Sequence, residues 1–205
     1  MTPTADAFLS SADPILKDLI TRFGPLPDRV TGLGDDPFDM LVLTISSQQL
    51  STRSARAIYE RIRARYGGRA PTPDEIWADD PELLRTSTGL SHAKVRALRS
   101  LSEHLLTGLL DFDRLRALDD DAMRALVCVT GIGEWTASIF LMFALGRPDV
   151  LVRGDLAIRQ AIRRAYGLES LPSLAAVTAL GEAWRPYRSR ACLYLWRSVE
   201  ISPVG

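Results

Sequence analysis

The sequence has little of what builds metal centres. It contains two cysteines, Cys128 and Cys192, and two histidines, His92 and His104. Structural zinc sites and iron–sulfur clusters each need about four ligands of these kinds, and neither cysteine belongs to a Cys-x-x-Cys pair. We therefore expect no iron–sulfur cluster and no histidine-based metal centre, and both histidines are expected to be ordinary surface or edge residues.

Long apolar runs are also absent. No stretch approaches the roughly 18–20 apolar residues that a membrane-spanning helix needs. The first residues lack the basic-then-apolar pattern of a signal peptide. We expect a cytoplasmic protein that has no membrane partner.

Excess charge of either sign is missing too, because 25 Lys and Arg residues balance 25 Asp and Glu residues. The distribution is less even. The segment 1–50 has three basic and seven acidic side chains, whereas 155–205 has seven basic and four acidic ones. This asymmetry permits a basic face for nucleic acid, but charge alone favours an ordinary solvated helix surface.

What the sequence does have is helix punctuation along its whole length. Asp-Pro pairs and single serines stand where a helix N-cap is expected, and glycines follow where helices end. Apolar residues recur mostly every three or four positions, and no convincing alternating strand or hairpin is present. The fold class is therefore predicted to be all-α. The expected helices follow Asp13, Asp36, Ser51, Asp80 and Ser91, and then cover 119–127, 134–145, 155–166, 173–184 and 188–201.

Between two of these helices lies the turn Val129-Thr130-Gly131-Ile132-Gly133. Two glycines one residue apart allow a sharp turn and a close backbone approach. Amides at the start of the following helix, from Glu134 on, favour an anion such as phosphate. A tight helix–helix turn without any ligand explains a bare Gly-x-Gly equally well.

The wider pattern is more specific. The hairpin Gly131-Ile132-Gly133-x-Trp135-Thr-Ala is followed twenty residues after Trp135 by Asp155, which opens a helix. Three further segments stand in order around it: 45–51 (ISSQQLS), 89–91 (GLS) with Lys94, and 184–189 (WRPYRS) with Trp196. Over residues 10–200 the chain resembles the helix–hairpin–helix DNA glycosylase superfamily, in its 3-methyladenine DNA glycosylase II (AlkA-type) branch. It is similar to a compact form of that branch without the N-terminal β-domain.

The resemblance implies one glycosylase unit with two helical lobes, approximately 36–145 (including the hairpin at 121–145) and 1–35 plus 146–205, and an active-site cleft between them. It implies a monomeric enzyme, associated with the nucleoid in a bacterium, that flips cationic methylpurines out of damaged double-stranded DNA and removes them by hydrolysis. Asp155 matches the catalytic aspartate. Its fixed negative charge would stabilise the oxocarbenium-like sugar as the glycosidic bond breaks, and it would also cap its helix.

The other implied roles follow from position in the family motifs. Trp135 stands where bifunctional members carry a lysine that forms an imine, so no strand cleavage is expected. Trp135 and Trp196, with Ile139, would line the base pocket, where an indole face attracts a cationic purine. No cofactor is expected to be required. The remaining assignments are a DNA wedge at Gln48, Gln49 and Leu50, phosphate binding at Gly131, Gly133 and Glu134, and a Na⁺ or K⁺ site formed by the carbonyls of Val127, Val129 and Ile132.

Two departures from the family pattern limit the comparison. Thr130 replaces a proline that is common before the hairpin glycines, and Ile139 stands where some relatives have an aromatic residue. The alternatives are a glycosylase of this fold for deaminated or oxidised bases, a helix–hairpin–helix protein that binds DNA without catalysis, and an all-α interaction protein that never contacts nucleic acid.

Overall fold

The computed structural model describes residues 4–27, 36–117 and 121–200, and within these ranges its regular elements are all helices. The all-α prediction is confirmed. No helix of the described part is long and apolar enough to cross a membrane. The thirteen described helices are α1 (Ala5–Ala12), α2 (Pro14–Phe23), α3 (Pro37–Ser47), α4 (Thr52–Arg65), α5 (Pro73–Ala78), α6 (Pro81–Thr88), α7 (His92–Leu106), α8 (Phe112–Ala117), α9 (Asp121–Val127), α10 (Glu134–Phe143), α11 (Leu156–Ala165), α12 (Leu174–Glu182) and α13 (Arg188–Glu200).

These helices form two compact units, described separately below. Unit 1 combines the described residues of 1–30 and 146–205, and unit 2 contains those of 31–145. Unit 1 therefore holds α1, α2 and α11–α13, while α3–α10 belong to unit 2.

Unit 1 is organised around α13, which packs against α1, α2 and α11. A buried carboxylate, Asp13, ties its segments together. This residue caps α2 through Oδ1, and its Oδ2 accepts hydrogen bonds from the Trp184 indole, at 2.8 Å, and from the Tyr166 hydroxyl. Hydrogen bonds to a buried charge contribute about 1.5–3 kcal/mol each. The N-terminal helices are thus held to residues more than 150 positions away.

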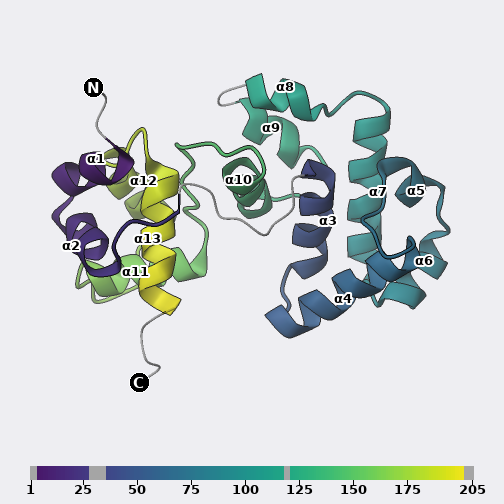
Figure 1. Ribbon diagram of the computed structural model, residues 1–205, viewed down its shortest axis with the longest axis horizontal. Helices are drawn as coiled ribbons and strands as arrows, with labels where there is room; N and C mark the ends of the chain where they lie inside the picture. The colour runs from purple at the N-terminus through teal and green to yellow at the C-terminus, as the bar shows by residue number, and fades with distance from the viewer. Residues whose placement is uncertain (1–3, 28–35, 118–120, 201–205) are drawn as a thin grey trace. The chain divides into compact units, whose positions relative to one another are not determined.

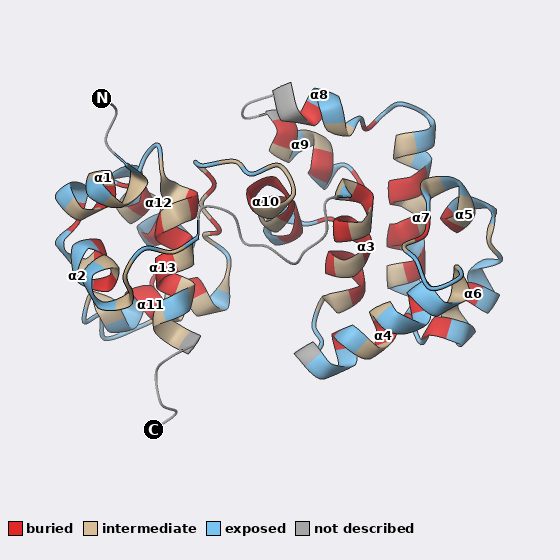
Figure 2. Ribbon diagram, viewed as in Figure 1, coloured by how far each residue is buried: buried red, intermediate tan, exposed pale blue. Residues whose placement is uncertain are grey.

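Unit 2 is organised around α3 and α7. Helix α3 packs against α4, α7 and α10, and α7 packs against α5 on its other side (Figure 1). Most side chains of α3 are buried, including Met40, Leu41 and Ile45 (Figure 2). Full burial of such a side chain is worth about 1.5–3 kcal/mol.

The start residues that the sequence predicts act as N-caps. Asp13, Asp36, Ser51, Asp80 and Ser91 each accept a hydrogen bond from a backbone amide of the helix that follows. Three helices, α1, α5 and α8, were not expected because they are too short to show a period. A signal for α5 was present nevertheless, since Thr72 and Glu75 form a reciprocal capping box.

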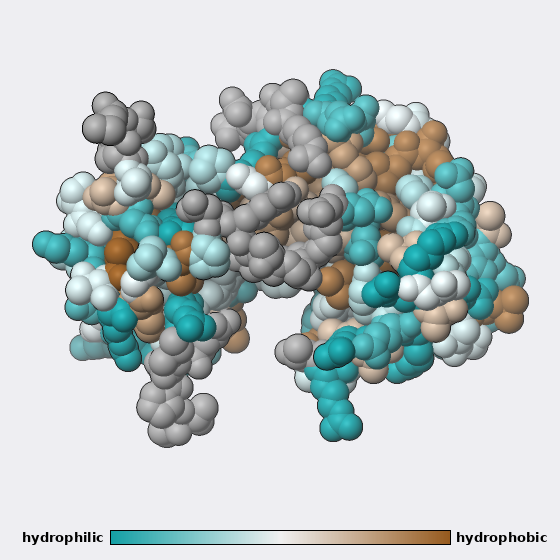
Figure 3. Space-filling model, viewed as in Figure 1, coloured by the Kyte–Doolittle hydropathy of each residue, from teal (hydrophilic) through white to brown (hydrophobic). Residues whose placement is uncertain are grey.

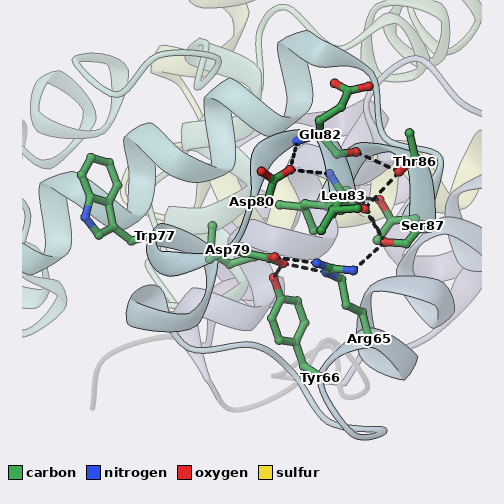
Figure 4. A network of polar contacts seen from close by, with 12 residues as sticks. Arg65, Tyr66, Trp77, Asp79, Asp80, Glu82, Leu83, Thr86 and Ser87 are labelled. Carbon is green, nitrogen blue, oxygen red and sulfur yellow. Dashed lines mark hydrogen bonds and ion pairs between the residues drawn. The ribbon is translucent and has the colours of Figure 1, made fainter.

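A polar network fastens α4 to the α5–α6 connection (Figure 4). Arg65 donates to both oxygens of Asp79, and the Tyr66 hydroxyl donates to the same carboxylate at 2.6 Å. The Arg65 hydrogen bond holds the pKa of Asp79 below its ordinary value. Asp79 is therefore charged when the protein is folded, and it stabilises the packing of α4.

Candidate active site

Asp155 is half-buried and stands immediately before α11 in unit 1. Its Oδ1 accepts the backbone N–H of Ile158 at 2.9 Å, so the residue caps the helix. The same oxygen accepts the indole N–H of Trp196 at 3.0 Å. Two donors on different helices therefore fix the orientation of this carboxylate.

The contact between Trp196 and Asp155 could not be read from the sequence, where the two residues are 41 positions apart. Trp196 lies on α13 and is half-buried. The sequence points to it as a pocket aromatic. The structure adds that its N–H is directed to the carboxylate.

A titratable group close to Asp155 is Cys192, one turn before Trp196 on α13. Its side chain is fully buried, and burial, reinforced by the charge of Asp155, raises the pKa of the thiol to about 12. Cys192 is therefore a neutral thiol at physiological pH. It adds no charge and no thiolate nucleophile to this part of unit 1.

The hairpin joins α9 to α10 in unit 2. Gly131 has φ of +83°, a conformation that side chains other than glycine rarely adopt. A Cβ on Gly131 would lie 2.5 Å from the Cβ of Ala97 on α7. Gly133 differs, because its φ is −91° and nothing lies within 4 Å of an added Cβ. Gly131 is thus required by the fold of unit 2, whereas Gly133 is not constrained by the described residues.

Helix α10 begins at Glu134, and its N-cap Gly133 provides no side chain to bind the first amides. The first amides of any helix have no carbonyl partner inside that helix, so they suit an anion. Along α10, an apolar stripe remains partly accessible at Trp135, Ile139 and Phe143, one turn apart. Trp135 is 41% exposed and Ile139 and Phe143 are partly exposed, while the other residues of the helix after Glu134 are buried. Phe143 stands one turn after Ile139 on this stripe; the sequence prediction did not include it, although its spacing of four residues was a signal.

The predicted wedge residues lie in the turn between α3 and α4. Gln49 has φ of 58°, which is unusual for a side-chain-bearing residue, and Leu50 is 39% exposed. Gln48 is different. Its amide nitrogen donates to the Gly131 carbonyl and to the Thr136 hydroxyl, both at 3.0 Å, so this side chain connects the turn to the hairpin.

Lys94, on α7, holds the same turn from the other side. Its ammonium donates to the carbonyl oxygens of Ser46, at 2.7 Å, and Gln48, at 3.0 Å. Partial burial lowers the pKa of Lys94 from its ordinary value. The sequence motif included this lysine but gave it no role.

The carbonyls proposed for a monovalent cation lie at the hairpin. The Val129 carbonyl accepts the amide of Ile132 at 3.0 Å, which closes the turn. A carbonyl oxygen has a second lone pair, so this bond is compatible with a cation ligand, and neutral oxygens are suitable ligands for Na⁺ or K⁺. Val127 and Ile132 stand on either side of Val129 in the hairpin. Among the described residues, no three His, Cys, Asp or Glu side chains gather where they could hold a metal ion.

Part of the basic excess of the C-terminal segment is neutralised inside unit 1. Arg185 and Arg188 pair with Asp149, and Arg190 pairs with Asp6. In unit 2, hydrophilic side chains cover the outer face of α4, which carries several arginines (Figure 3). Exposed arginines without a side-chain partner in the described ranges include Arg53, Arg96, Arg163 and Arg164.

Comparison with known proteins identifies the family. A model of the HhH-GPD superfamily of base excision DNA repair proteins matches residues 42–186, which include both the hairpin and Asp155. The chain belongs to the HhH-GPD superfamily.

Relatives of this HhH-GPD protein include DNA-3-methyladenine glycosylase 1 of Schizosaccharomyces pombe, which is 31% identical over 97% of the chain and 88% of its own length. The structure is similar to that of an S. pombe 3-methyladenine DNA glycosylase in complex with abasic DNA, with a TM-score of 0.86, 31% identity and 98% of each chain covered. It is also similar to a DNA-3-methyladenine glycosidase of Bacillus halodurans, with a TM-score of 0.85, 33% identity, and 98% and 90% of the two chains covered.

Proposed function

We propose that this HhH-GPD protein is a monofunctional DNA glycosylase that removes cationic methylpurines from duplex DNA in base excision repair. The observation that carries the proposal is the Asp155 carboxylate, held by the Ile158 amide and the Trp196 indole. A non-catalytic DNA-binding protein has no need of a carboxylate fixed in this way. The named activity of the relatives supports the same reaction class.

In the proposed reaction the bond between C1′ and the purine nitrogen breaks, and its electron pair leaves with the base. Positive charge then develops at C1′, and the carboxylate of Asp155 stabilises it. Water adds through its oxygen to C1′ and loses a proton, which Asp155 can accept. The products are the free base and an abasic strand that is still intact.

A base that is already cationic leaves as a neutral molecule, so no acid is needed to protonate it. This suits the sequence around Asp155, because the stretch 121–164 contains no histidine. The histidines, His92 and His104, belong to α7 of unit 2, and the Nδ1 atom of His104 contacts the Ser100 carbonyl at 2.7 Å. Uracil and oxidised guanine are neutral and would depend on such an acid. Alkylated purines are therefore the preferred substrate class.

Each remaining prediction has a place in this scheme. Trp135 and Trp196 keep the role that the sequence predicts, as aromatic partners for a flipped base, and Ile139 follows Trp135 by one turn on α10. The exposed Leu50, with Gln49, fills the space that the base leaves. Phosphate binds at the start of α10, at Gly131, Gly133 and the backbone amide of Glu134. A Na⁺ or K⁺ ion at the carbonyls of Val127, Val129 and Ile132 would add positive charge next to that phosphate.

Strand cleavage is not part of the proposed activity. An imine requires an amine that reaches the sugar, and the sequence has only two lysines. The ammonium of Lys94 is bound to two backbone carbonyls, and Lys17 lies on α2. We further propose that the protein is a cytoplasmic monomer whose partner is damaged double-stranded DNA.

The test uses a panel of duplexes, each with one lesion, incubated with wild-type protein and with Asp155→Asn. We expect excision of 3-methyladenine and 7-methylguanine, with strand breaks seen only after alkali. Asp155→Asn should lower the single-turnover rate about 10²–10³-fold and leave the affinity for DNA unchanged. Near wild-type rates for the variant would contradict the role of Asp155. A borohydride-trapped adduct would contradict the monofunctional reaction.

A further inference from the structure

Lys94 makes an unusual pair of contacts for a lysine. Its ammonium is directed at the protein backbone, to the carbonyls of Ser46 and Gln48 at 2.7 and 3.0 Å. These oxygens belong to the last turn and the C-cap of α3, where the helix dipole favours a cation. The other lysine, Lys17, is exposed on α2. Only Lys94 therefore has a geometry that couples two segments of unit 2.

The turn held by Lys94 is under conformational constraint. Gln49 adopts φ of 58°, a backbone conformation that residues with a side chain rarely adopt. Such a conformation persists only where neighbouring contacts determine it. The preceding residue, Gln48, provides these contacts, because its carbonyl is bound to Lys94 and its side chain to the hairpin. The following residue, Leu50, is left exposed.

Three elements meet in this arrangement: α7 through Lys94, the α3–α4 turn through Gln48, and the hairpin through the Gly131 carbonyl and the Thr136 hydroxyl. All three belong to unit 2. The hairpin is the proposed phosphate-binding element and the turn is the proposed wedge. Their relative geometry determines where Leu50 enters a duplex once the hairpin has bound the backbone.

We propose that Lys94 is a positioning residue for base extrusion, which holds the α3–α4 turn so that Gln49 and Leu50 enter the duplex in register with the hairpin. The inference rests on the proposed function. It gives Lys94 no contact with the reacting atoms. Two of its three ammonium protons are used by the backbone, which separates this role from that of a nucleophile.

The positioning role of Lys94 predicts a difference between substrates that a general loss of protein stability does not predict. A wedge is needed when the lesion is paired and stacked, and it matters far less when no partner base holds the lesion. We therefore compare 7-methylguanine in a fully paired duplex with 7-methylguanine in a one-nucleotide bulge. The variant is Lys94→Met, which keeps an unbranched side chain of similar length. Lys17→Met is the matched control, because it removes the other lysine from an exposed position.

We expect Lys94→Met to lower the single-turnover rate on the paired duplex by about 10-fold, since misplacement of a functional group by a fraction of an ångström to 1 Å costs up to about 10²-fold. On the bulge the loss should be less than about 3-fold, and Lys17→Met should match wild type on both substrates. Leu50→Ala should show the same selectivity. Because the two residues act in one step, the double variant should be no slower than Leu50→Ala alone.

The outcomes separate the two proposals. Wild-type protein that excises 7-methylguanine from neither substrate contradicts the proposed function. If the wild type is active and Lys94→Met lowers the rate equally on both substrates, or on neither, the positioning role is overturned. A fully additive double variant also overturns it. A borohydride adduct that is lost in Lys94→Met would assign Lys94 to covalent chemistry instead.

Discussion

Replacement of Trp196 by phenylalanine removes the indole N–H and leaves an aromatic ring. The N–H donates to Asp155 Oδ1 at 3.0 Å, and the Ile158 amide donates to the same atom at 2.9 Å. A hydrogen bond to a charged group is worth about 1.5–3 kcal/mol. Because the Ile158 amide still holds the carboxylate, we expect a loss near the lower limit. A loss of about 1.4 kcal/mol in the transition state corresponds to a rate about 10-fold lower.

The assay is single-turnover excision from duplexes that contain 7-methylguanine or neutral hypoxanthine. If the Trp196 indole acts through Asp155, Trp196→Phe should slow both lesions by the same factor, because the carboxylate acts on the sugar. A loss of stacking alone would mainly slow the cationic lesion. Trp135→Phe is the matched control, since it changes an indole on α10 and leaves the Asp155 hydrogen bonds in place.

A double-mutant cycle with Asp155→Asn tests the coupling directly. Once the charged carboxylate has been removed, Trp196→Phe should have little further effect on the rate. Two contacting residues that act together show coupling of about 0.5–3 kcal/mol in such a cycle. An unchanged 10-fold effect in the Asp155→Asn background would refute the reasoning, and so would a loss confined to 7-methylguanine.

The remaining predictions address the hairpin, the pocket and the stability of unit 2. Gly133→Glu should weaken binding to damaged and undamaged duplex alike. It should not lower the melting temperature of the protein, because nothing lies within 4 Å of a Cβ added at this position. Gly133→Ala is the control, and a changed lesion preference at constant affinity would argue against a phosphate site. Trp135→Ala should slow excision of 7-methylguanine more than that of hypoxanthine, because cation–π attraction at a desolvated site is worth about 2 kcal/mol. Equal losses on the two lesions would contradict the pocket assignment. Asp79→Asn should lower the unfolding free energy by about 1–3 kcal/mol at pH 7. The pKa of Asp79 is lower in the folded protein than in the unfolded chain, where it is about 4. The carboxylate therefore contributes its full share of the unfolding free energy above about pH 4, and this share is lost as the pH falls through the folded pKa. Thermal unfolding measured from pH 7 to pH 2 should therefore show the variant and wild type converging in acid, and a constant difference would contradict this sign.

The helix starts could be predicted from the sequence because capping is local. Asp13, for example, reads as an N-cap from its neighbours alone. Its bonds to Tyr166 and Trp184 could not be predicted, since they depend on how distant helices pack. The capping box of α5 was readable, but a helix of six residues shows no period.

In the candidate site, too, local features could be predicted from the sequence and contacts between distant segments could not. Motif spacing identified Asp155 and Trp196 separately, whereas their hydrogen bond depends on the packing of α11 against α13. Gln48 was predicted to act in the wedge, and only the structure shows its amide bound to the hairpin. The need for glycine at position 131 has two causes. A sharp turn was expected there, but the approach of Ala97 was not visible from the sequence.

Unit 1 is formed by two segments that are far apart in the sequence, and this has a consequence for folding during translation. Residues 36–145 emerge from the ribosome as a contiguous segment, so unit 2 can fold while translation continues. Unit 1 must wait, because α1 and α2 pack against α13, which is made after all of unit 2. The carboxylate of Asp155 receives its indole partner only when Trp196 has been added. A nascent chain can therefore complete its hairpin well before the proposed reaction centre, and the order of synthesis would separate the proposed capacity to hold DNA from the proposed capacity to cut a base away from it.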